Sequence, residues 1–338
     1  MSKKNSSVIL KSGFKDYSDL SKIFENFCDK IKNLKKKKFV VALSGGPDSL
    51  ALVALCKAYS YKTKTKFEFV LVNHNIRKNS TKEALQVKKL LKKHQINLKI
   101  INNKIKINRN IQSQARQIRY DLIKKYCNKK SIKIILTAHN LEDQVETFFI
   151  RLSRGSGLTG LSSMRTLTKI GNNINLYRPL LDTKKKYLIK LSKIMFNKFF
   201  KDPSNKDQKF LRIKIRNLEK PLKKSGIHYE QIIKSINNLA SSKATLDQYF
   251  EKIFKETTII SNKKVSIDLK KFKSLNKEIK MNIINLSIKY LKNNYYNPRS
   301  KKVINLVSNI ESNKFENSTL GGCLFTRNKD TLVLKSEK

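Results

Sequence analysis

The stretch ALSGGPDSLALVALCKAY, residues 42–59, decides the fold of this chain. An apolar run of strand length, FVVAL (39–43), leads directly into two glycines, a proline and an Asp-Ser pair, and an apolar helical pattern follows over 49–60. A plain strand-to-helix connection needs one glycine, so two in succession indicate that a ligand comes close to the backbone. A helix N-terminus presents free N–H groups and a positive dipole end, which favours a phosphate.

The same alternation of apolar strands and helical patterns continues beyond this turn. It predicts an α/β fold in which the N-terminal domain has a parallel, Rossmann-like sheet covered on both faces. Further strands are expected at 67–72, 98–101, 132–136 and 174–180, and further helices at 81–94, 110–128 and 183–196. Ligands of such sheets bind at the carboxyl ends of the strands, which is where the glycine-rich turn lies.

The pattern changes after Pro203, where a turn and a basic stretch closed by Pro221 precede mainly helical sequence. A chain of 338 residues is longer than one core usually fills, so two domains are expected. We predict a catalytic domain over 1–218 and a smaller, mainly helical domain over 219–338. The tail TLGGCLFTRNKDTLVLKSEK (319–338) predicts two short strands around a turn.

The charge of the chain is strongly positive, with 74 Lys and Arg against 25 Asp and Glu, a net +49. One interpretation is a nucleic-acid partner bound through its phosphates. The other is an AT-rich genome, which enriches Lys, Asn and Ile in every protein. The sequence has neither a run of about 20 apolar residues nor a signal-peptide pattern. Its four cysteines are scattered, so we expect a cytoplasmic protein without a membrane partner.

The glycine-rich turn has hydroxyl groups at Ser44 and Ser49 and a carboxylate at Asp48. It lacks the lysine of a Walker A loop, so it is not that motif. An acid beside phosphates indicates a metal ion or another cation as its partner. The alternative is a strand-to-helix turn that binds no ligand.

A second group of polar residues follows the expected strand at 132–136. On a helix, His139, Asp143 and Glu146 share one side, and the apolar residues Leu141 and Val145 belong to the opposite side. Paired carboxylates near a triphosphate can hold magnesium or neutralise an incoming amine. Alone, such a stripe is more often a solvated helix face.

Two arginines occur in QARQIRY (114–120), outside the apolar stripe of the expected helix. Arg116 and Arg119 are suited to bind phosphate oxygens in a bidentate manner. In isolation they would be ordinary surface charge.

The motif SGGPDS resembles the PP-loop of the N-type ATP pyrophosphatases, which is shared by GMP, NAD and asparagine synthetases and by tRNA-modifying enzymes. The ordered set of further motifs resembles the tRNA(Ile)-lysidine synthetase family. These motifs are VNHNIRKNSTKEA (72–84), ARQIRY (115–120), TAHNLEDQVET (137–147), RLSRGSGLTGLSSM (151–164), YRPLL (177–181), DPSNKDQKFLRIKIR (202–216) and, more loosely, TLGGC (319–323). The chain departs from the family at Asn73, where Asp is common, and at Lys201, where an acid is usual.

The resemblance implies an enzyme that joins free L-lysine to C2 of the wobble cytidine of the tRNA(Ile) whose anticodon is CAU. ATP first adenylates the base, lysine then displaces AMP, and the tRNA reads AUA instead of AUG. ATP, Mg²⁺, L-lysine and this tRNA are therefore the expected ligands. The sequence leaves open whether the chain forms a homodimer.

The resemblance also assigns roles to individual residues. Ser44, Gly45, Gly46, Pro47, Asp48 and Ser49 are expected to bind ATP, with Asp48 as the magnesium ligand. The expected catalytic residues are Asp48, Arg119, His139, Asp143 and Glu146. The expected tRNA-binding residues are Arg116, Arg154, Arg178, Arg212 and Arg216. The alternatives are a tRNA 2-thiolase of the same superfamily, which would need cysteines placed to carry sulfur, and a basic RNA-binding protein without catalytic activity.

Overall fold

The computed structural model describes residues 6–76, 79–107, 111–171, 173–200, 210–261, 263–292, 298–312 and 315–337. The chain forms two compact units, Met1–Leu239 and Ala240–Lys338. Residues 219–239, which follow the boundary expected from the sequence, cluster with the first unit. The assignment of a catalytic and a tRNA-binding domain stays a prediction.

Unit 1 contains a six-stranded sheet with the order β3-β2-β1-β4-β6-β5. Its strands are parallel except for β5, which pairs antiparallel with β6. This confirms the predicted α/β fold class. The strands are β1 (Lys38–Leu43), β2 (Lys66–Asn73), β3 (Leu98–Asn102), β4 (Ile134–Leu136), β5 (Leu167–Gly171) and β6 (Ile174–Tyr177).

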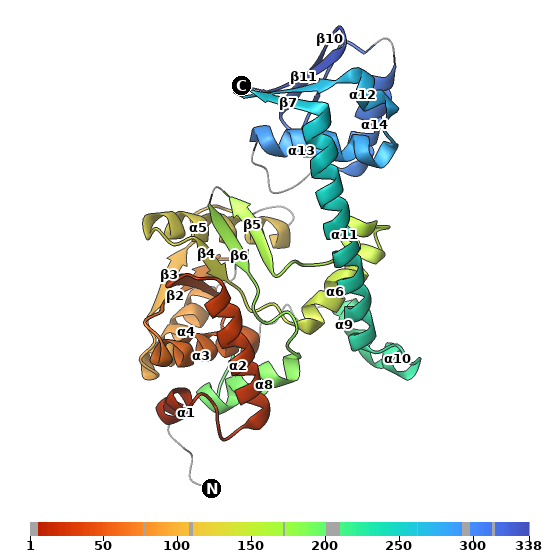
Figure 1. The fold of residues 1–338 in the computed structure, drawn as a ribbon. Coiled ribbons are helices and arrows are strands. Elements are labelled where there is room, and N and C mark those ends of the chain that lie inside the picture. Colours follow the sequence, from red (N-terminus) through yellow and green to blue (C-terminus); the bar gives the residue numbers. More distant parts are fainter. Residues whose placement is uncertain are drawn as a thin grey trace. The chain divides into compact units, whose positions relative to one another are not determined.

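Helices cover both faces of this sheet (Figure 1). The side chains of β1 alternate between two cores: Phe39 and Val41 pack with α1, α2, α3, α4 and α8, whereas Val40 packs with α5. A strand buried on both sides explains why FVVAL is continuously apolar. The helices are α1 (Ser6–Ser12), α2 (Ser18–Asn33), α3 (Pro47–Lys62), α4 (Ser80–Lys93), α5 (Ile111–Lys129) and α8 (Lys185–Phe196).

Helix α3 is buried around most of its circumference, from Leu50 to Cys56. Gly46 is its N-cap, and Pro47 occupies the first turn, where its missing N–H leaves no hydrogen bond unmade. Because α3 packs between the sheet and α8, the glycine-rich turn at its start is attached to a rigid element.

The remaining helices of unit 1 follow β4 and β6 along the chain. They are α6 (Leu141–Leu152), α7 (Leu158–Leu161), α9 (Leu211–Asn217), α10 (Glu219–Lys224) and the beginning of α11 (Tyr229–Thr257). Leu141 and Val145 of α6 form a small core with Ile232 and Ile236 of α11. This confirms the predicted apolar side of α6.

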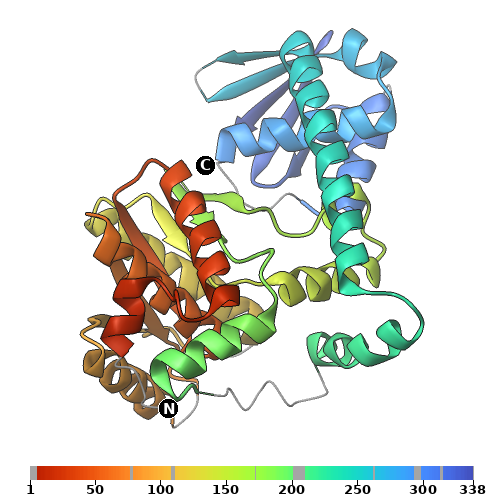
Figure 2. The same ribbon diagram turned by 60° about the horizontal axis from the view of Figure 1, so that its bottom comes forward.

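Unit 2 is mainly helical, as predicted, but it is built around a five-stranded antiparallel sheet with the order β7-β8-β11-β10-β9 (Figure 2). The sequence predicted only two strands in its tail, where the structure has three. The strands are β7 (Thr258–Ser261), β8 (Lys264–Asp268), β9 (Asn317–Leu320), β10 (Cys323–Asn328) and β11 (Thr331–Ser336). The helices are the end of α11, α12 (Leu269–Ser274), α13 (Lys277–Lys292) and α14 (Ser300–Glu311).

Two hairpins were not expected from the sequence. β5 and β6 form one, and β6 ends at Tyr177 instead of continuing to residue 180. β7 and β8 form the other, in a stretch predicted to be helical. There Val265 and Ile267 alternate into the core of unit 2, so packing of a period-two pattern prevails over the surrounding helical sequence. Within the described ranges, no helix combines the length and apolar composition that crossing a membrane requires.

A substitution at Gly45 tests how tightly the turn is packed. Gly45 has φ +82°, and a Cβ there would lie 2.7 Å from Val87 Cγ2, whereas Gly155, at φ +64°, has no atom within 4 Å of such a Cβ. We expect Gly155→Ala to cost about 1–2 kcal/mol of unfolding free energy through left-handed strain alone. Gly45→Ala should cost clearly more, because Val87 must also move. Urea unfolding measures both, and equal losses would show that the turn has room for a side chain.

Candidate active site

The candidate site lies where the strand order of the parallel sheet reverses. β1 pairs with β2 on one side and with β4 on the other, and all three strands point the same way. The loops that follow β1 and β4 therefore leave the sheet at the same edge and diverge from one another. In open α/β sheets this is the crevice in which ligands bind. The glycine-rich turn and the start of α6 both lie there, as the sequence predicted.

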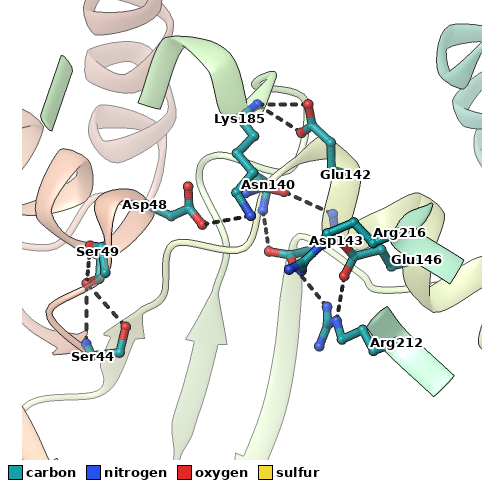
Figure 3. Close-up of polar contacts among 11 residues, drawn as sticks. Ser44, Asp48, Ser49, Asn140, Glu142, Asp143, Glu146, Lys185, Arg212 and Arg216 are labelled. Atoms are coloured by element: carbon teal, nitrogen blue, oxygen red, sulfur yellow. Dashed lines mark hydrogen bonds and ion pairs between the residues drawn. The ribbon is translucent and has the colours of Figure 1, made fainter. Parts of the chain in front are cut away.

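The glycine-rich turn is closed by its own two serines. The Ser49 hydroxyl donates to the Gly46 carbonyl oxygen at 2.9 Å and accepts from the Ser44 backbone N–H at 3.3 Å (Figure 3). The Gly45 carbonyl oxygen accepts from the backbone N–H of Phe200 at 3.1 Å. These bonds fix the curvature of the turn at the N-terminus of α3.

Asp48 lies in the first turn of α3, where its carboxylate is mostly buried. Burial raises its pKa to about 6, the charge of Asp143 adds to this, and Lys185, Arg216 and the Asn140 side chain oppose it. Lys185 Nζ lies 3.9 Å from Asp48 Oδ2, and Oδ1 has no hydrogen-bond partner among the described residues. Asp48 thus has an unsatisfied oxygen that a cation could bind.

The start of α6 is fixed by a capping box. The Asn140 side chain accepts from the Asp143 backbone N–H at 2.9 Å, and the Asn140 N–H donates to Asp143 Oδ2 at 3.2 Å. Glu142 accepts the backbone N–H of Lys185 at 2.9 Å, which ties α6 to the start of α8. Asn140 is fully buried, and its side chain also acts on Asp48, whose pKa it lowers.

The acidic face of α6 is paired with two arginines of α9. Arg212 donates from Nη2 to Asp143 Oδ1 at 2.8 Å and from Nε to Glu146 Oε2 at 2.6 Å. Arg216 Nε donates to Glu146 Oε1 at 2.7 Å (Figure 3). Glu146 is only 2% exposed, and a carboxylate so deeply buried would be strongly destabilising without such partners. Asp143 and Glu146 therefore do not form a solvated helix face.

His139 lies at the same edge in a strongly positive environment. Its Nδ1 hydrogen-bonds with the Thr137 hydroxyl at 3.0 Å. Burial lowers the pKa of His139 well below its usual range, and Arg178 and Arg116 are the next contributors, ahead of Arg212 and Arg119. The imidazole is therefore neutral at physiological pH, and the net charge around it suits an anion.

The arginines predicted to bind tRNA lie in different surroundings. Arg154 is exposed in the loop after α6, and Arg116 packs its guanidinium over the Tyr120 ring at 5.2 Å. Arg178 is only 3% exposed and donates to the Arg165 carbonyl and the Thr168 hydroxyl at 2.6 and 2.8 Å. A contact of Arg178 with tRNA stays a prediction that would require it to leave these bonds.

Sequence reasoning missed Lys185, Asn140 and Glu142. Lys185 is one of three consecutive lysines, so nothing in the sequence distinguishes the one that faces Asp48. Asn73, which departs from the family pattern, is buried and donates to Thr81 and Asn102. Lys201, the other departure, lies outside the described residues.

Asp48 is the acid of this site whose free carboxylate oxygen could bind a magnesium ion held together with a nucleotide. The described residues contain no group of three or more His, Cys, Asp or Glu side chains that could hold a metal. Magnesium commonly binds one or two carboxylates together with substrate phosphates. The unsatisfied oxygen of Asp48, beside the N-terminus of α3, fits that arrangement.

Comparisons with known proteins agree with this geometry. A family model described as a PP-loop domain matches residues 18–221. The tRNA(Ile)-lysidine synthase of Wolbachia pipientis wMel is 32% identical over 324 residues, which cover 94% of this chain and 75% of that protein. The tRNA(Ile)-lysidine synthase of Rickettsia akari is 31% identical over 320 residues, which cover 92% and 72%.

A solved structure, the U34-tRNA thiolase NcsA from Methanococcus maripaludis with its 4Fe-4S cluster, superposes with a TM-score of 0.56. The match covers 66% of this chain and 80% of the thiolase at 18% identity. At that identity the likeness shows a shared fold.

The raised pKa of Asp48 predicts a stabilising substitution. The pKa of Asp48 is higher in the folded state than the 3.8 of the unfolded chain, so the folded state binds the proton more strongly. The ionised carboxylate therefore destabilises the fold by its full amount above about pH 6, and this cost disappears as the pH falls below 3.8. We expect Asp48→Asn to raise the free energy of unfolding by roughly 1–3 kcal/mol at pH 7.5. The gain should shrink as the pH falls towards 4.

Thermal unfolding from pH 4 to 7.5 checks this, with Asp19→Asn as a control of opposite sign. Asp19 bonds Lys190 at 2.7 Å, which lowers its pKa. Asp19→Asn should therefore destabilise the protein at pH 7.5, and this destabilisation should fade as the pH falls towards 4. A stability change of Asp48→Asn that does not depend on pH would contradict the raised pKa of Asp48.

Proposed function

The chain belongs to the tRNA(Ile)-lysidine synthase family and contains its PP-loop domain, and from this premise we propose the reaction. It joins the ε-amine of L-lysine to C2 of the wobble cytidine of tRNA(Ile) with a CAU anticodon, using ATP. The observation that carries the proposal is the meeting of the glycine-rich turn and the acidic face of α6 at the switch point of the sheet.

The reaction needs two steps because C2 of cytosine is a poor electrophile. In the first step the O2 oxygen attacks the α-phosphorus of ATP, and pyrophosphate leaves. In the second step the lysine amine adds to C2, loses a proton, and expels AMP together with the O2 oxygen. The protein must therefore hold a polyanion and an ammonium-bearing substrate side by side.

Ser44–Ser49 would bind the phosphates of ATP. The N-terminus of α3 supplies backbone N–H groups and a positive dipole end, and the left-handed Gly45 lets the anion approach. Asp48 would hold magnesium at the polyphosphate, where the ion supplies charge neutralisation. Lys185, at 3.9 Å from Asp48, would add a second positive charge beside the phosphates.

Asp143 and Glu146 would hold the ammonium group of lysine. Their present partners show that this surface already binds cations, since Arg212 and Arg216 lie 2.6–2.8 Å from the carboxylate oxygens. A bound ammonium would share these oxygens or replace a guanidinium. An arginine released in this way would be free to bind a phosphate, in keeping with the predicted tRNA contacts of Arg212 and Arg216.

Arg116, Arg119 and the neutral His139 would line the position of the cytidine. The base must leave the anticodon stack to reach a site at the edge of the sheet. Arginines there would spread the negative charge that builds up during attack on the α-phosphorus. Arg154 and the second unit would contact the tRNA through its phosphates and shape.

The two alternative functions fit the structure less well. A 2-thiolase that carries sulfur on cysteine needs accessible thiols, yet Cys56, Cys127 and Cys323 are buried, and burial raises the pKa of Cys28 to about 11. A binding protein without chemistry would have no need of a buried carboxylate such as Asp48 beside an anion-binding turn, because its ionised form destabilises the fold.

One assay separates the three functions. Release of AMP and pyrophosphate from ATP is followed with tRNA, with and without lysine, with Asp48→Asn as the inactive control. Lysine-dependent AMP release supports the proposal. Sulfur-dependent turnover would support a thiolase, and the absence of AMP in all mixtures would support a binding protein.

A pair of substitutions tests the role of Glu146. Glu146→Gln and Arg216→Gln break the same ion pair, but only the first removes a negative charge that lysine would need. We expect Glu146→Gln to raise the KM for lysine about ten- to a hundred-fold, the value of one charge-assisted contact, while adenylated tRNA still accumulates. Arg216→Gln should leave the KM for lysine unchanged or lower it.

Single-turnover reactions with α-labelled ATP, chased with lysine, give both quantities. If Glu146→Gln fails to adenylate tRNA, the acids serve the metal-nucleotide. If both variants raise the KM for lysine equally, Glu146 acts only by fixing α9.

The charge of the chain predicts how tRNA binding responds to salt. If the net +49 reflects contacts with tRNA, affinity should fall steeply from low to moderate salt. Each neutralised phosphate contributes about 0.7–0.9 to the log–log slope. Filter binding over a salt series measures it, and a flat profile would indicate that genome composition alone explains the lysines.

A further inference from the structure

His74 lies at the carboxyl end of β2, next to the strand that leads into the glycine-rich turn. Its side chain contacts α5, where the Arg119 Nε–H donates to His74 Nε2 at 3.3 Å. The function proposed above uses Arg119 and gives no role to His74.

The hydrogen bond with Arg119 determines where the imidazole carries its proton. A guanidinium can only donate, so His74 Nε2 must be the acceptor, and the proton of the neutral ring lies on Nδ1. Burial and the Arg119 charge lower the pKa of His74 to about 4, so the ring is neutral at physiological pH. The His74 ring therefore accepts a hydrogen bond at Nε2 and offers an N–H donor at Nδ1.

The donor side of the ring is unsatisfied. His74 Nδ1 is buried and has no hydrogen-bond partner among the described residues. A buried N–H without an acceptor is unfavourable, and native proteins keep few of them, which indicates a partner that arrives with a ligand.

The backbone around His74 is held in place by side-chain amides. The Asn103 Nδ2–H donates to the His74 carbonyl oxygen at 3.3 Å, and the Asn75 Nδ2–H donates to the Asn103 carbonyl oxygen at 3.1 Å. Together they join the loops after β2 and β3, so the imidazole is attached to a braced segment. A rigid, polar ring at the ligand edge of a parallel sheet is suited to position a substrate.

We propose that His74 has two functions in the reaction: through Nε2 it orients the Arg119 guanidinium, and through Nδ1–H it donates to an acceptor atom of a nucleotide. The nucleotide is ATP or the target cytidine, which both offer phosphate, carbonyl or ring-nitrogen acceptors. This inference rests on the proposed function and adds a positioning and binding residue to it.

Three substitutions separate the two functions. His74→Ala removes both, His74→Gln keeps an acceptor near the position of Nε2, and His74→Asn keeps a donor near the position of Nδ1. His228→Ala is the matched control, because His228 is exposed and precedes α11. Each variant is compared for kcat and KM of AMP formation in the presence of tRNA and lysine, for ATP and tRNA affinity, and for thermal stability.

We expect His74→Ala to lower kcat/KM for AMP formation by about tenfold or more, since a charge-assisted contact is lost. His74→Gln and His74→Asn should each recover part of this loss, and His228→Ala should behave as wild type. A change confined to ATP affinity identifies ATP as the acceptor. A raised KM for tRNA at saturating ATP, which His74→Asn restores and His74→Gln does not, identifies the cytidine.

Wild-type activity in His74→Ala would overturn the proposal, and so would equal losses in all three His74 variants at unchanged thermal stability. Recovery by His74→Gln alone would retain the orientation of Arg119 and overturn the nucleotide hydrogen bond, and recovery by His74→Asn alone would do the reverse. If the wild-type protein forms no AMP with tRNA and lysine, the proposed function fails. Equilibrium binding of ATP to the same variants then still tests His74.

Discussion

The parallel pairing of β1 with both of its neighbours is the constraint on which the site depends. Residues 39–43 of β1 pack into the cores on both faces of the sheet, so they are all apolar and carry no chemistry of their own. Chemistry is confined to the carboxyl edge, where the chain must turn into α3 and α6. Asp48 and Asp143, which are 95 residues apart in sequence, come close enough there for the charge of Asp143 to raise the pKa of Asp48.

The buried negative charge of Glu146 is balanced by ion pairs with arginines rather than by solvent. Glu146 is tolerated in the interior because two guanidiniums bind it, and these pairs in turn hold α9 against α6. Breaking such a pair from one side leaves an uncompensated buried charge. Asp48 is different, because the Lys185 ammonium lies 3.9 Å away and its second oxygen has no hydrogen-bond partner among the described residues. It is the acid that a further cation would stabilise most.

Local sequence pattern was sufficient to predict most of unit 1, because strands buried on both faces and amphipathic helices each have a clear period. It also placed Asp143 and Glu146 on one side of a helix. It could not reveal that Arg212 and Arg216 pair with them, since these bonds join residues 66 to 70 positions apart. Lys185 was missed for the same reason: its neighbours in sequence are also lysines, and only the packing of α8 on α3 selects it. The strands β7 and β8 were missed because their alternation is short and lies between helices.

The scarcity of acids makes their positions more informative than those of the cations. With 74 basic and 25 acidic side chains, a basic residue at any surface position needs no special explanation, whereas three acids at one sheet edge do. Two of these acids are bound by arginines, and the third is destabilised by its own burial. A fold gains nothing in stability by burying Asp48 in this way, which supports the proposal that this carboxylate serves a ligand. In the proposed function, the net charge would draw the polyanionic tRNA to this protein, and the few carboxylates would determine where on the sheet it reacts.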